Sequence, residues 1–120
     1  MRIAIALLFF AGFEASAKPQ RVVRWTTAET SKRIYKGTCP VSLILTGTIT
    51  AARPGEFTYG WKRSDGGLGP LRTVQASRRG ETWRVRELWE VSGTTRGWAQ
   101  LWIASERHGS RVTWFRVQCK

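Results

Sequence analysis

The stretch that decides the fold is GWAQLWIASERHGSRVTWFRVQC, residues Gly97 to Cys119. It predicts two β-strands joined by a turn at Glu106–Gly109, where polar residues and a glycine interrupt the apolar alternation. Tryptophans occupy one face of this predicted hairpin, and aliphatic and phenylalanine side chains occupy the other. A half-buried strand usually shows one apolar and one polar face. The stretch therefore raises the question of which face is the core.

The chain has two cysteines, Cys39 and Cys119, and one histidine. In an exported protein such a pair predicts one disulfide. The alternative is a reactive thiol or half of a metal site, but this set of ligands is too small for a metal. We predict a structural disulfide, no metal and no cofactor.

An inward Cys119 answers the question of the core face. Alternation then places Phe115 and Val117 inside and places Trp114 and Arg116 outside. The opposite register would bury the guanidinium of Arg116 without a partner, which is costly. The predicted core face of the stretch is Ala99, Leu101, Ile103, Phe115 and Val117.

Residues 1–17 have the three parts of a secretory signal peptide. A basic start at Arg2 precedes the apolar run Ile3–Phe13, and Ala15-Ser16-Ala17 supplies a small-residue cleavage site. The apolar run is too short to span a bilayer as a permanent helix. We therefore expect a secreted or periplasmic chain with no transmembrane segment.

The formal net charge of +12 is large for a chain of 120 residues. Such a charge favours contact with polyanions and repels like molecules. An arginine-rich composition can also reflect the genome rather than a binding site, and this alternative stays open.

Short alternating segments separated by glycine and proline predict an all-β domain. Beyond the quoted stretch, the predicted strands are Arg21–Thr27, Val41–Ala51, Phe57–Arg63, Leu71–Ser77 and Thr82–Val91. The first places Val23 and Trp25 on one face, and Ala28–Thr38 is predicted as a connection. About seven antiparallel strands with one disulfide indicate an immunoglobulin-like sandwich. Residues 18–38 would form a basic N-terminal strand and connection, and residues 39–120 the sandwich core.

Five segments of the chain follow a recognisable order. They are CPVSLILTGTIT, FTYGWKRSDGG, TWRVRELWEV, GWAQLWI and the closing FRVQC. This order resembles a family of small secreted bacterial domains over about Cys39 to Cys119. The resemblance implies an immunoglobulin-like fold and an exported location. The family has no assigned activity, so the resemblance carries over no catalytic residue. The chain departs from the family in its basic charge and in Trp102 and Trp114, where polar residues are usual.

The outward face of the predicted hairpin and its neighbouring strand is the candidate ligand-binding site. Its residues are Trp98, Gln100, Trp102, Trp114, Arg116 and Lys62. One interpretation is that tryptophans stack on each other and on arginine and brace the sheet. Another is a flat binding platform, because contiguous exposed apolar patches usually mark interaction sites. Gly60 lacks a side chain, so a neighbouring ring could lie across it.

No set of residues predicts catalysis, and we assign no catalytic residue. The leading hypothesis is a non-enzymatic binding module for an anionic cell-envelope glycan or a similar polyanionic surface. A protein–protein module is the alternative, since tryptophan and arginine also dominate interface hot spots. Nucleic acid is a secondary partner class, and the sequence does not define an oligomeric state. A third hypothesis is a small secreted hydrolase that uses Glu106 and His108.

Overall fold

Nine β-strands form the part of the chain that the computed structural model describes, residues 21–120. They are β1 (Val23–Thr30), β2 (Ile34–Gly37), β3 (Val41–Ala51), β4 (Gly55–Arg63), β5 (Arg72–Ala76), β6 (Thr82–Val91), β7 (Thr95–Ile103), β8 (His108–Gly109) and β9 (Thr113–Cys119). The predicted signal peptide, residues 1–17, lies outside the described residues.

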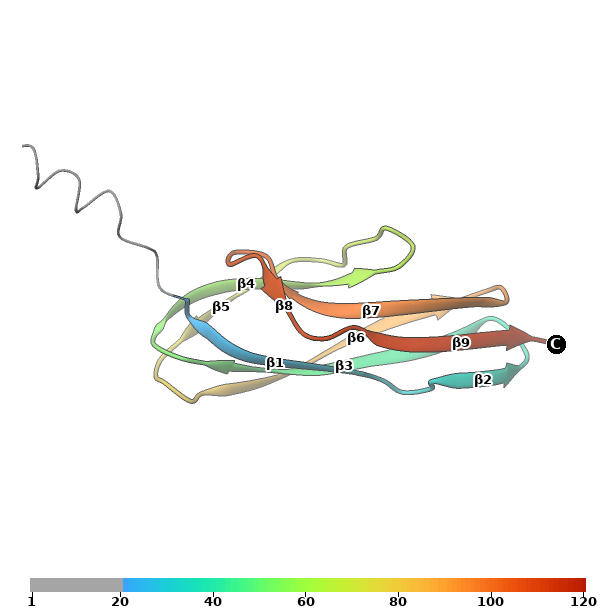
Figure 1. Cartoon of the computed structure of the whole chain (residues 1–120), viewed down its shortest axis with the longest axis horizontal. Coiled ribbons are helices and arrows are strands. Elements are labelled where there is room, and N and C mark those ends of the chain that lie inside the picture. Colours follow the sequence, from blue (N-terminus) through green and yellow to red (C-terminus); the bar gives the residue numbers. More distant parts are fainter. Residues whose placement is uncertain (1–20) are drawn as a thin grey trace, which may run out of the picture.

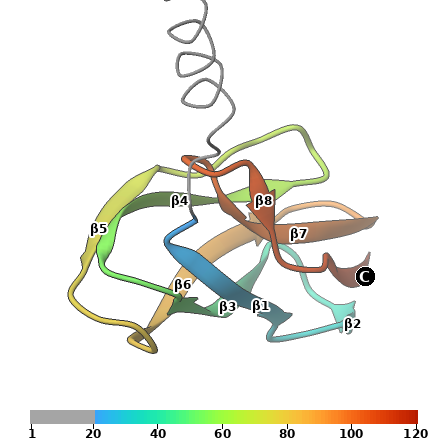
Figure 2. The ribbon, with the colours of Figure 1, turned by 60° about the vertical axis from the view of Figure 1, so that its left-hand side comes forward.

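The strands form two sheets that pack face to face as an immunoglobulin-like sandwich (Figures 1 and 2). The smaller sheet has the order β1-β3-β6, and the larger has the order β2-β9-β7-β4-β5, with β8 beside β7. All neighbouring strands are antiparallel except β2, which runs parallel to β9. The all-β prediction is confirmed. The strands beyond the expected seven are β2 and β8, which are too short to show alternation.

The core lies between the sheets and follows the alternation of the long strands. Along β3 every second residue is buried, from Val41 to Ala51. At the centre, the ring of Trp61 on β4 lies over Gly47 on β3, where a Cβ would be 3.2 Å from the ring and 2.5 Å from the carbonyl oxygen of Thr27. The aromatic contacts of the core include an edge-to-face pair of Trp89 and Phe115, with ring centroids 4.9 Å apart.

The quoted hairpin, now β7 to β9, has the predicted core face. Leu101, Ile103 and Val117 are fully buried, and Phe115 is 4% exposed. The opposite side chains of β9, Trp114 and Arg116, face solvent. The hairpin's second apolar face is therefore the outer face of the larger sheet.

The predicted disulfide is confirmed, with 5.5 Å between the Cα atoms of Cys39 and Cys119. Cys39 lies just before β3 in one sheet, and Cys119 ends β9 in the other. The bond therefore links the two sheets at one end of the sandwich.

The N-terminal segment differs from the prediction in two respects. Val23 is 1% exposed but Trp25 is 62% exposed, so they do not share a face. The cause is a β-bulge: Val23 pairs with Ala51 and Trp25 with Thr50, which shifts the alternation by one residue. The expected connection at Ala28–Thr38 also contains the end of β1 and all of β2.

Candidate functional site

The six residues of the candidate site lie on the outer face of the larger sheet. The strand register places Lys62 on β4 opposite Gln100 on β7. It places Trp98 on β7 opposite Trp114 on β9. Over residues 21–120 no ring–ring contact joins these tryptophans to one another, so the expected mutual stacking is not seen.

Half of this set is held against the sheet by neighbouring groups. The Lys62 ammonium lies 3.4 Å from the centroid of the Trp102 ring, a cation–π contact. The side-chain amide of Gln100 donates to the carbonyl of Ser110 at 2.8 Å. Trp98, Trp102 and Lys62 are only partly exposed. These contacts give Lys62, Gln100 and Trp102 a bracing role.

Gly60 is covered, but not by an aromatic ring. A Cβ at Gly60 would lie 2.8 Å from Cδ2 of Leu71 and 3.5 Å from Cδ1 of Leu68. The loop after β4 folds back beside that strand, and the backbone N–H of Gly69 donates to the carbonyl of Trp61 at 2.9 Å. The atoms nearest to Gly60 therefore belong to this loop and not to the neighbouring ring that the sequence suggested.

The open half of the face centres on Trp114, which is 56% exposed. Beside it, β2 contributes Ile34, which is 71% exposed and pairs with Arg116. Together these strands line a hollow of about 540 Å³, which we call the arginine groove. Its lining residues are Arg33, Ile34, Arg96, Trp114, Phe115 and Arg116.

The charges of the arginine groove are of one sign. Arg96 and Arg116 are directly opposite each other in the antiparallel pair, an arrangement that is unfavourable unless an anion lies between them. Arg33 is the third cation, and its carbonyl accepts the backbone N–H of Arg116 at 2.8 Å. None of the lining residues is acidic. The ion pairs among residues 21–120 involve none of these three arginines.

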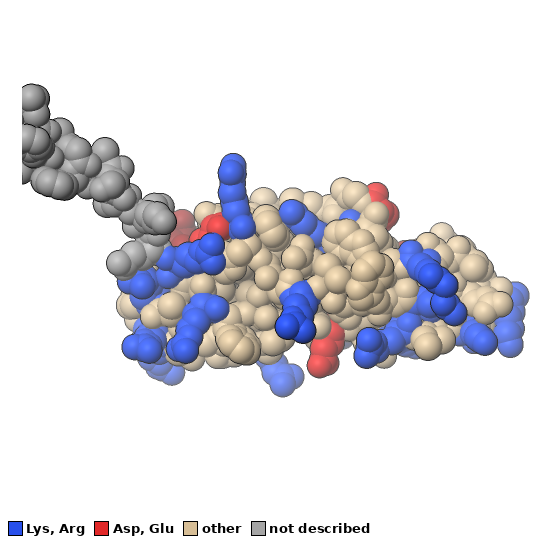
Figure 3. All heavy atoms as spheres, viewed as in Figure 1, with Lys and Arg blue, Asp and Glu red and all other residues tan. Residues whose placement is uncertain are grey.

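Sequence reasoning identified Trp114 and Arg116 as outward residues and Phe115 as core, but it missed Arg33, Ile34 and Arg96. Arg96 could have been found, since it lies two residues before Trp98 and shares its strand face. Arg33 and Ile34 could not, because nothing local in the sequence indicates that β2 pairs in parallel with the last strand. Lys and Arg also extend along the whole visible face of the molecule, where Asp and Glu are few (Figure 3).

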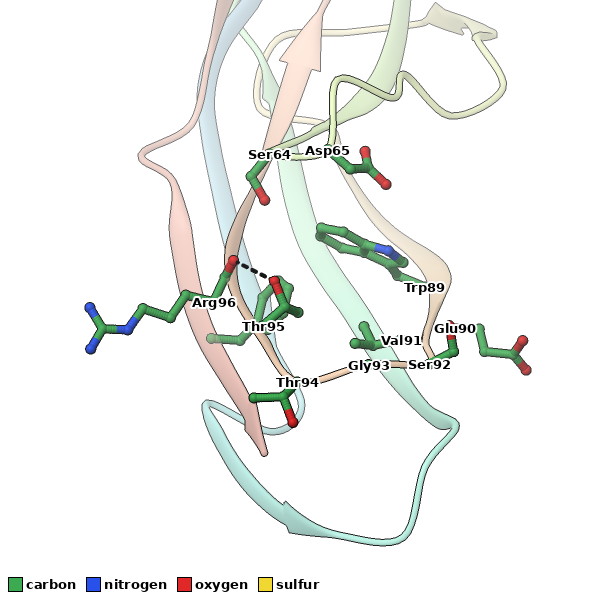
Figure 4. A pocket seen from close by; sticks show the side chains of 11 residues that line it. Ser64, Asp65, Trp89, Glu90, Val91, Ser92, Gly93, Thr94, Thr95 and Arg96 are labelled. Carbon is green, nitrogen blue, oxygen red and sulfur yellow. Dashed lines mark hydrogen bonds between the residues drawn. The ribbon is translucent and has the colours of Figure 1, made fainter. Parts of the chain in front are cut away.

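A second hollow, of about 370 Å³, lies at the turn between β6 and β7 (Figure 4). Its lining includes the carboxylates of Asp65 and Glu90, and Asp65 pairs with Arg63 at 3.4 Å. Figure 4 shows the side chain of Arg96 directed away from this hollow. The charged residues that remain beside this hollow are acidic, so the arginine groove is the stronger candidate for an anion site.

Glu106 and His108, the residues of the hydrolase hypothesis, are held in structural contacts. The Glu106 carboxylate accepts the backbone N–H of Val22 at 2.8 Å and that of Val23 at 3.3 Å. His108 Nε2 lies 2.9 Å from Glu106 Oε1. This carboxylate therefore anchors the start of β1 to the β7–β8 turn.

Neither a metal site nor a membrane span is found among residues 21–120. Their His, Cys, Asp and Glu side chains form no group of three or more that could hold a metal ion. No helix in this range is long and apolar enough to cross a membrane.

Burial raises the pKa of the Tyr59 phenol above its usual 10.0; the charge of Arg72 opposes this shift and that of Glu87 adds to it. Tyr59 belongs to the core, so this shift does not mark a site.

No protein-family model and no curated protein matches the chain, so the family resemblance stays a prediction. Solved structures with a similar fold include a β-glucosidase from Listeria innocua in complex with glucose (TM-score 0.59, 14% identity, 84% of this chain and 17% of that one). Another is a β-glucosidase from Erythrobacter marinus (TM-score 0.60, 7% identity, 79% and 15%). A third is the CARDB domain of a Pyrococcus furiosus protein in complex with di-metal ions (TM-score 0.51, 12% identity, 85% and 100%). The chain spans less than a fifth of the length of either β-glucosidase. At these identities the likeness shows the fold alone.

Proposed function

We propose that this chain is an exported, non-enzymatic binding module for anionic glycan chains of a cell envelope. The observation that carries the proposal is the arginine groove, in which three arginines with no carboxylate partner among residues 21–120 lie beside the exposed Trp114 and Ile34. Guanidinium groups bind carboxylate, sulfate and phosphate through paired hydrogen bonds. An indole ring offers a flat apolar surface to the face of a sugar ring.

Two further features support an exported location. Residues 1–17 read as a signal peptide, and the Cys39–Cys119 disulfide suits an oxidising compartment. The contacts of Glu106 with the backbone of β1 favour a structural role for that carboxylate over hydrolysis. A structural role for Glu106 supports a binding module over a hydrolase.

A protein partner is the second candidate function. It is favoured by the exposure of Trp114 and Ile34 side by side, since exposed aromatic and aliphatic side chains beside arginine are typical of interface hot spots. Ionic strength separates the two candidates. Polyanion binding weakens steeply with added salt, by analogy with counterion release, whereas a tryptophan-centred protein interface is far less sensitive.

The test is binding of the purified protein to immobilised heparin, a sulfated glycan, at low and at physiological salt. We expect Arg96→Gln with Arg116→Gln to weaken binding by about tenfold at low salt and to flatten the salt dependence, because two anion contacts are lost. The matched control is Arg84→Gln with Arg86→Gln. These two exposed arginines lie on the outer face of the smaller sheet, so the control loses the same net charge elsewhere.

Equal weakening by the two double variants would mean that net charge alone drives binding, and the groove would be discarded as the site. Anionic lipid vesicles and neutral dextran serve as parallel probes. Preference for vesicles over heparin would contradict a glycan ligand. Binding to a protein that survives high salt but is lost in Trp114→Ala would favour the protein interface.

A further inference from the structure

A second basic and aromatic hollow lies between β1 and β8, on the seam between the two sheets. Its volume is about 560 Å³, and we call it the Trp25 hollow. The lining residues on which the argument rests are Arg24 and Trp25 from β1 and Ser110 and Arg111 after β8. Trp25 is 62% exposed, slightly more than Trp114 of the arginine groove, and Arg24 and Arg111 are exposed beside it. No acidic residue lines this hollow.

The outward position of Trp25 is built into the backbone. The β-bulge between Val23 and Trp25 turns the indole away from the core, and bulges are often found where a strand re-aims a side chain. The strand start is fixed because the backbone N–H groups of Val22 and Val23 donate to Glu106. Trp25 is thus presented to solvent from an anchored strand.

The opposite wall of the Trp25 hollow is equally well fixed. The Ser110 hydroxyl accepts the backbone N–H of Leu101 at 3.1 Å, and the N–H of Ser110 donates back to the carbonyl of Leu101 at 2.9 Å. Ser110 is 5% exposed. These bonds hold Arg111, the next residue, at the mouth of the hollow. A ligand would therefore meet preformed walls on both sides.

The Trp25 hollow and the arginine groove are neighbours along one side of the sandwich. The end of β1 lies beside the start of β9 (Figure 1). There the hydroxyls of Thr30 and Thr113 are 3.0 Å apart, within hydrogen-bond distance. Arg111 borders the hollow and Trp114 borders the groove, and three residues of chain span at most ~11 Å. Trp25 of the hollow is on β1, and Ile34 of the groove begins β2, the next strand of the chain.

We propose that the Trp25 hollow is a second subsite for the anionic glycan, so that one glycan chain occupies both the hollow and the arginine groove. This inference rests on the proposed function. Each subsite offers the same chemistry, an exposed indole for a sugar face and arginines for its anionic groups. Binding at one subsite raises the effective concentration of the chain at the other, which increases affinity without any new contact.

The test uses heparin fragments of increasing length, with stoichiometry and affinity measured by titration calorimetry. Each wild-type molecule should bind two disaccharides. It should bind only one long fragment, with an affinity at least about tenfold higher than for a disaccharide. Trp25→Ala with Arg111→Gln should bind one disaccharide and lose the gain with length. The matched control is Leu88→Ala with Arg84→Gln, which removes an exposed apolar side chain and one charge from the outer face of β6. This control should keep the wild-type stoichiometry and length dependence, with an affinity that is slightly and equally lower for every fragment.

The outcomes separate this inference from the proposed function. If wild-type protein binds no heparin fragment of any length, the proposed function fails and the second subsite falls with it. If Arg96→Gln with Arg116→Gln weakens binding but Trp25→Ala with Arg111→Gln keeps both the stoichiometry and the length dependence, only the second subsite is overturned. Should the Trp25 variant fold poorly by circular dichroism, Arg24→Gln with Arg111→Gln replaces it, because both side chains are exposed.

Discussion

Gly47 on β3 faces the core, beneath the buried ring of Trp61. A Cβ at this position would lie 2.5 Å from the carbonyl oxygen of Thr27, 2.8 Å from Cδ2 of Leu101 and 3.2 Å from the Trp61 ring. The carbonyl belongs to the neighbouring strand and cannot move without disturbing the sheet. We expect Gly47→Ala to lower the free energy of unfolding by about 1–3 kcal/mol, measured by urea denaturation.

Gly93 supplies the control for this substitution. It lies in the turn between β6 and β7, and a Cβ there would meet no atom within 4 Å. Gly93→Ala should therefore change the free energy of unfolding by no more than about 0.5 kcal/mol. If the two alanine variants unfold alike, close packing over Gly47 does not set the cost.

Residue-level prediction from the sequence succeeded where one alternation runs without interruption. The inward Phe115 and Val117 and the outward Trp114 follow from the orientation of Cys119 alone. It failed at Trp25, because a bulge that shifts the alternation leaves no local signature. It also did not foresee that Lys62 covers Trp102, since cross-strand contacts depend on a register that the sequence does not state.

At the scale of the element, β1 depends on a side chain from the far end of the chain. Glu106 accepts backbone N–H groups of Val22 and Val23 and also contacts His108. Hydrogen bonds to a charged acceptor contribute about 1.5–3 kcal/mol. We expect Glu106→Gln to lower the free energy of unfolding by about 1–3 kcal/mol and to speed amide exchange at Val22 and Val23, as followed by NMR.

A matched charge change tests the local origin of that effect. Glu90 on β6 is exposed, so Glu90→Gln alters the net charge equally and should change stability by less than about 0.5 kcal/mol. Similar losses in both variants, or unchanged amide exchange at Val22 and Val23 in Glu106→Gln, would contradict the anchoring role.

The long strands were predictable, and the two shortest, β2 and β8, were not. β3 and β6 carry ten or more residues with clear alternation, and both have the predicted bounds. The four-residue β2 forms only because it pairs with β9, a contact between distant parts of the chain. Arg33 and Ile34 join the arginine groove through that pairing and escaped prediction, whereas Trp114 at its centre did not.

At the scale of the whole molecule, the disulfide joins the two sheets and borders β2. It closes a loop of 80 residues, and the chain-entropy model assigns such a loop about 4–5 kcal/mol. Cys119 pairs with Gly37 of β2, and the N–H of Lys120 donates to the carbonyl of Gly37 at 2.8 Å. The covalent bond therefore also secures the strand that carries Ile34 into the arginine groove.

Removing the disulfide should weaken the fold first and the groove with it. We expect Cys39→Ala with Cys119→Ala to lower the free energy of unfolding by about 4–5 kcal/mol, a large part of the 5–15 kcal/mol typical of a domain. Loss of the bond should accelerate amide exchange more in β2 than in β3, because β2 is a short edge strand whose end lies beside the lost bond. Reduction of the wild-type protein should reproduce both effects, whereas the Gly93→Ala control should show neither. A loss below about 1 kcal/mol, or equal acceleration of exchange in β2 and β3, would show that strand pairing alone holds β2 in the larger sheet.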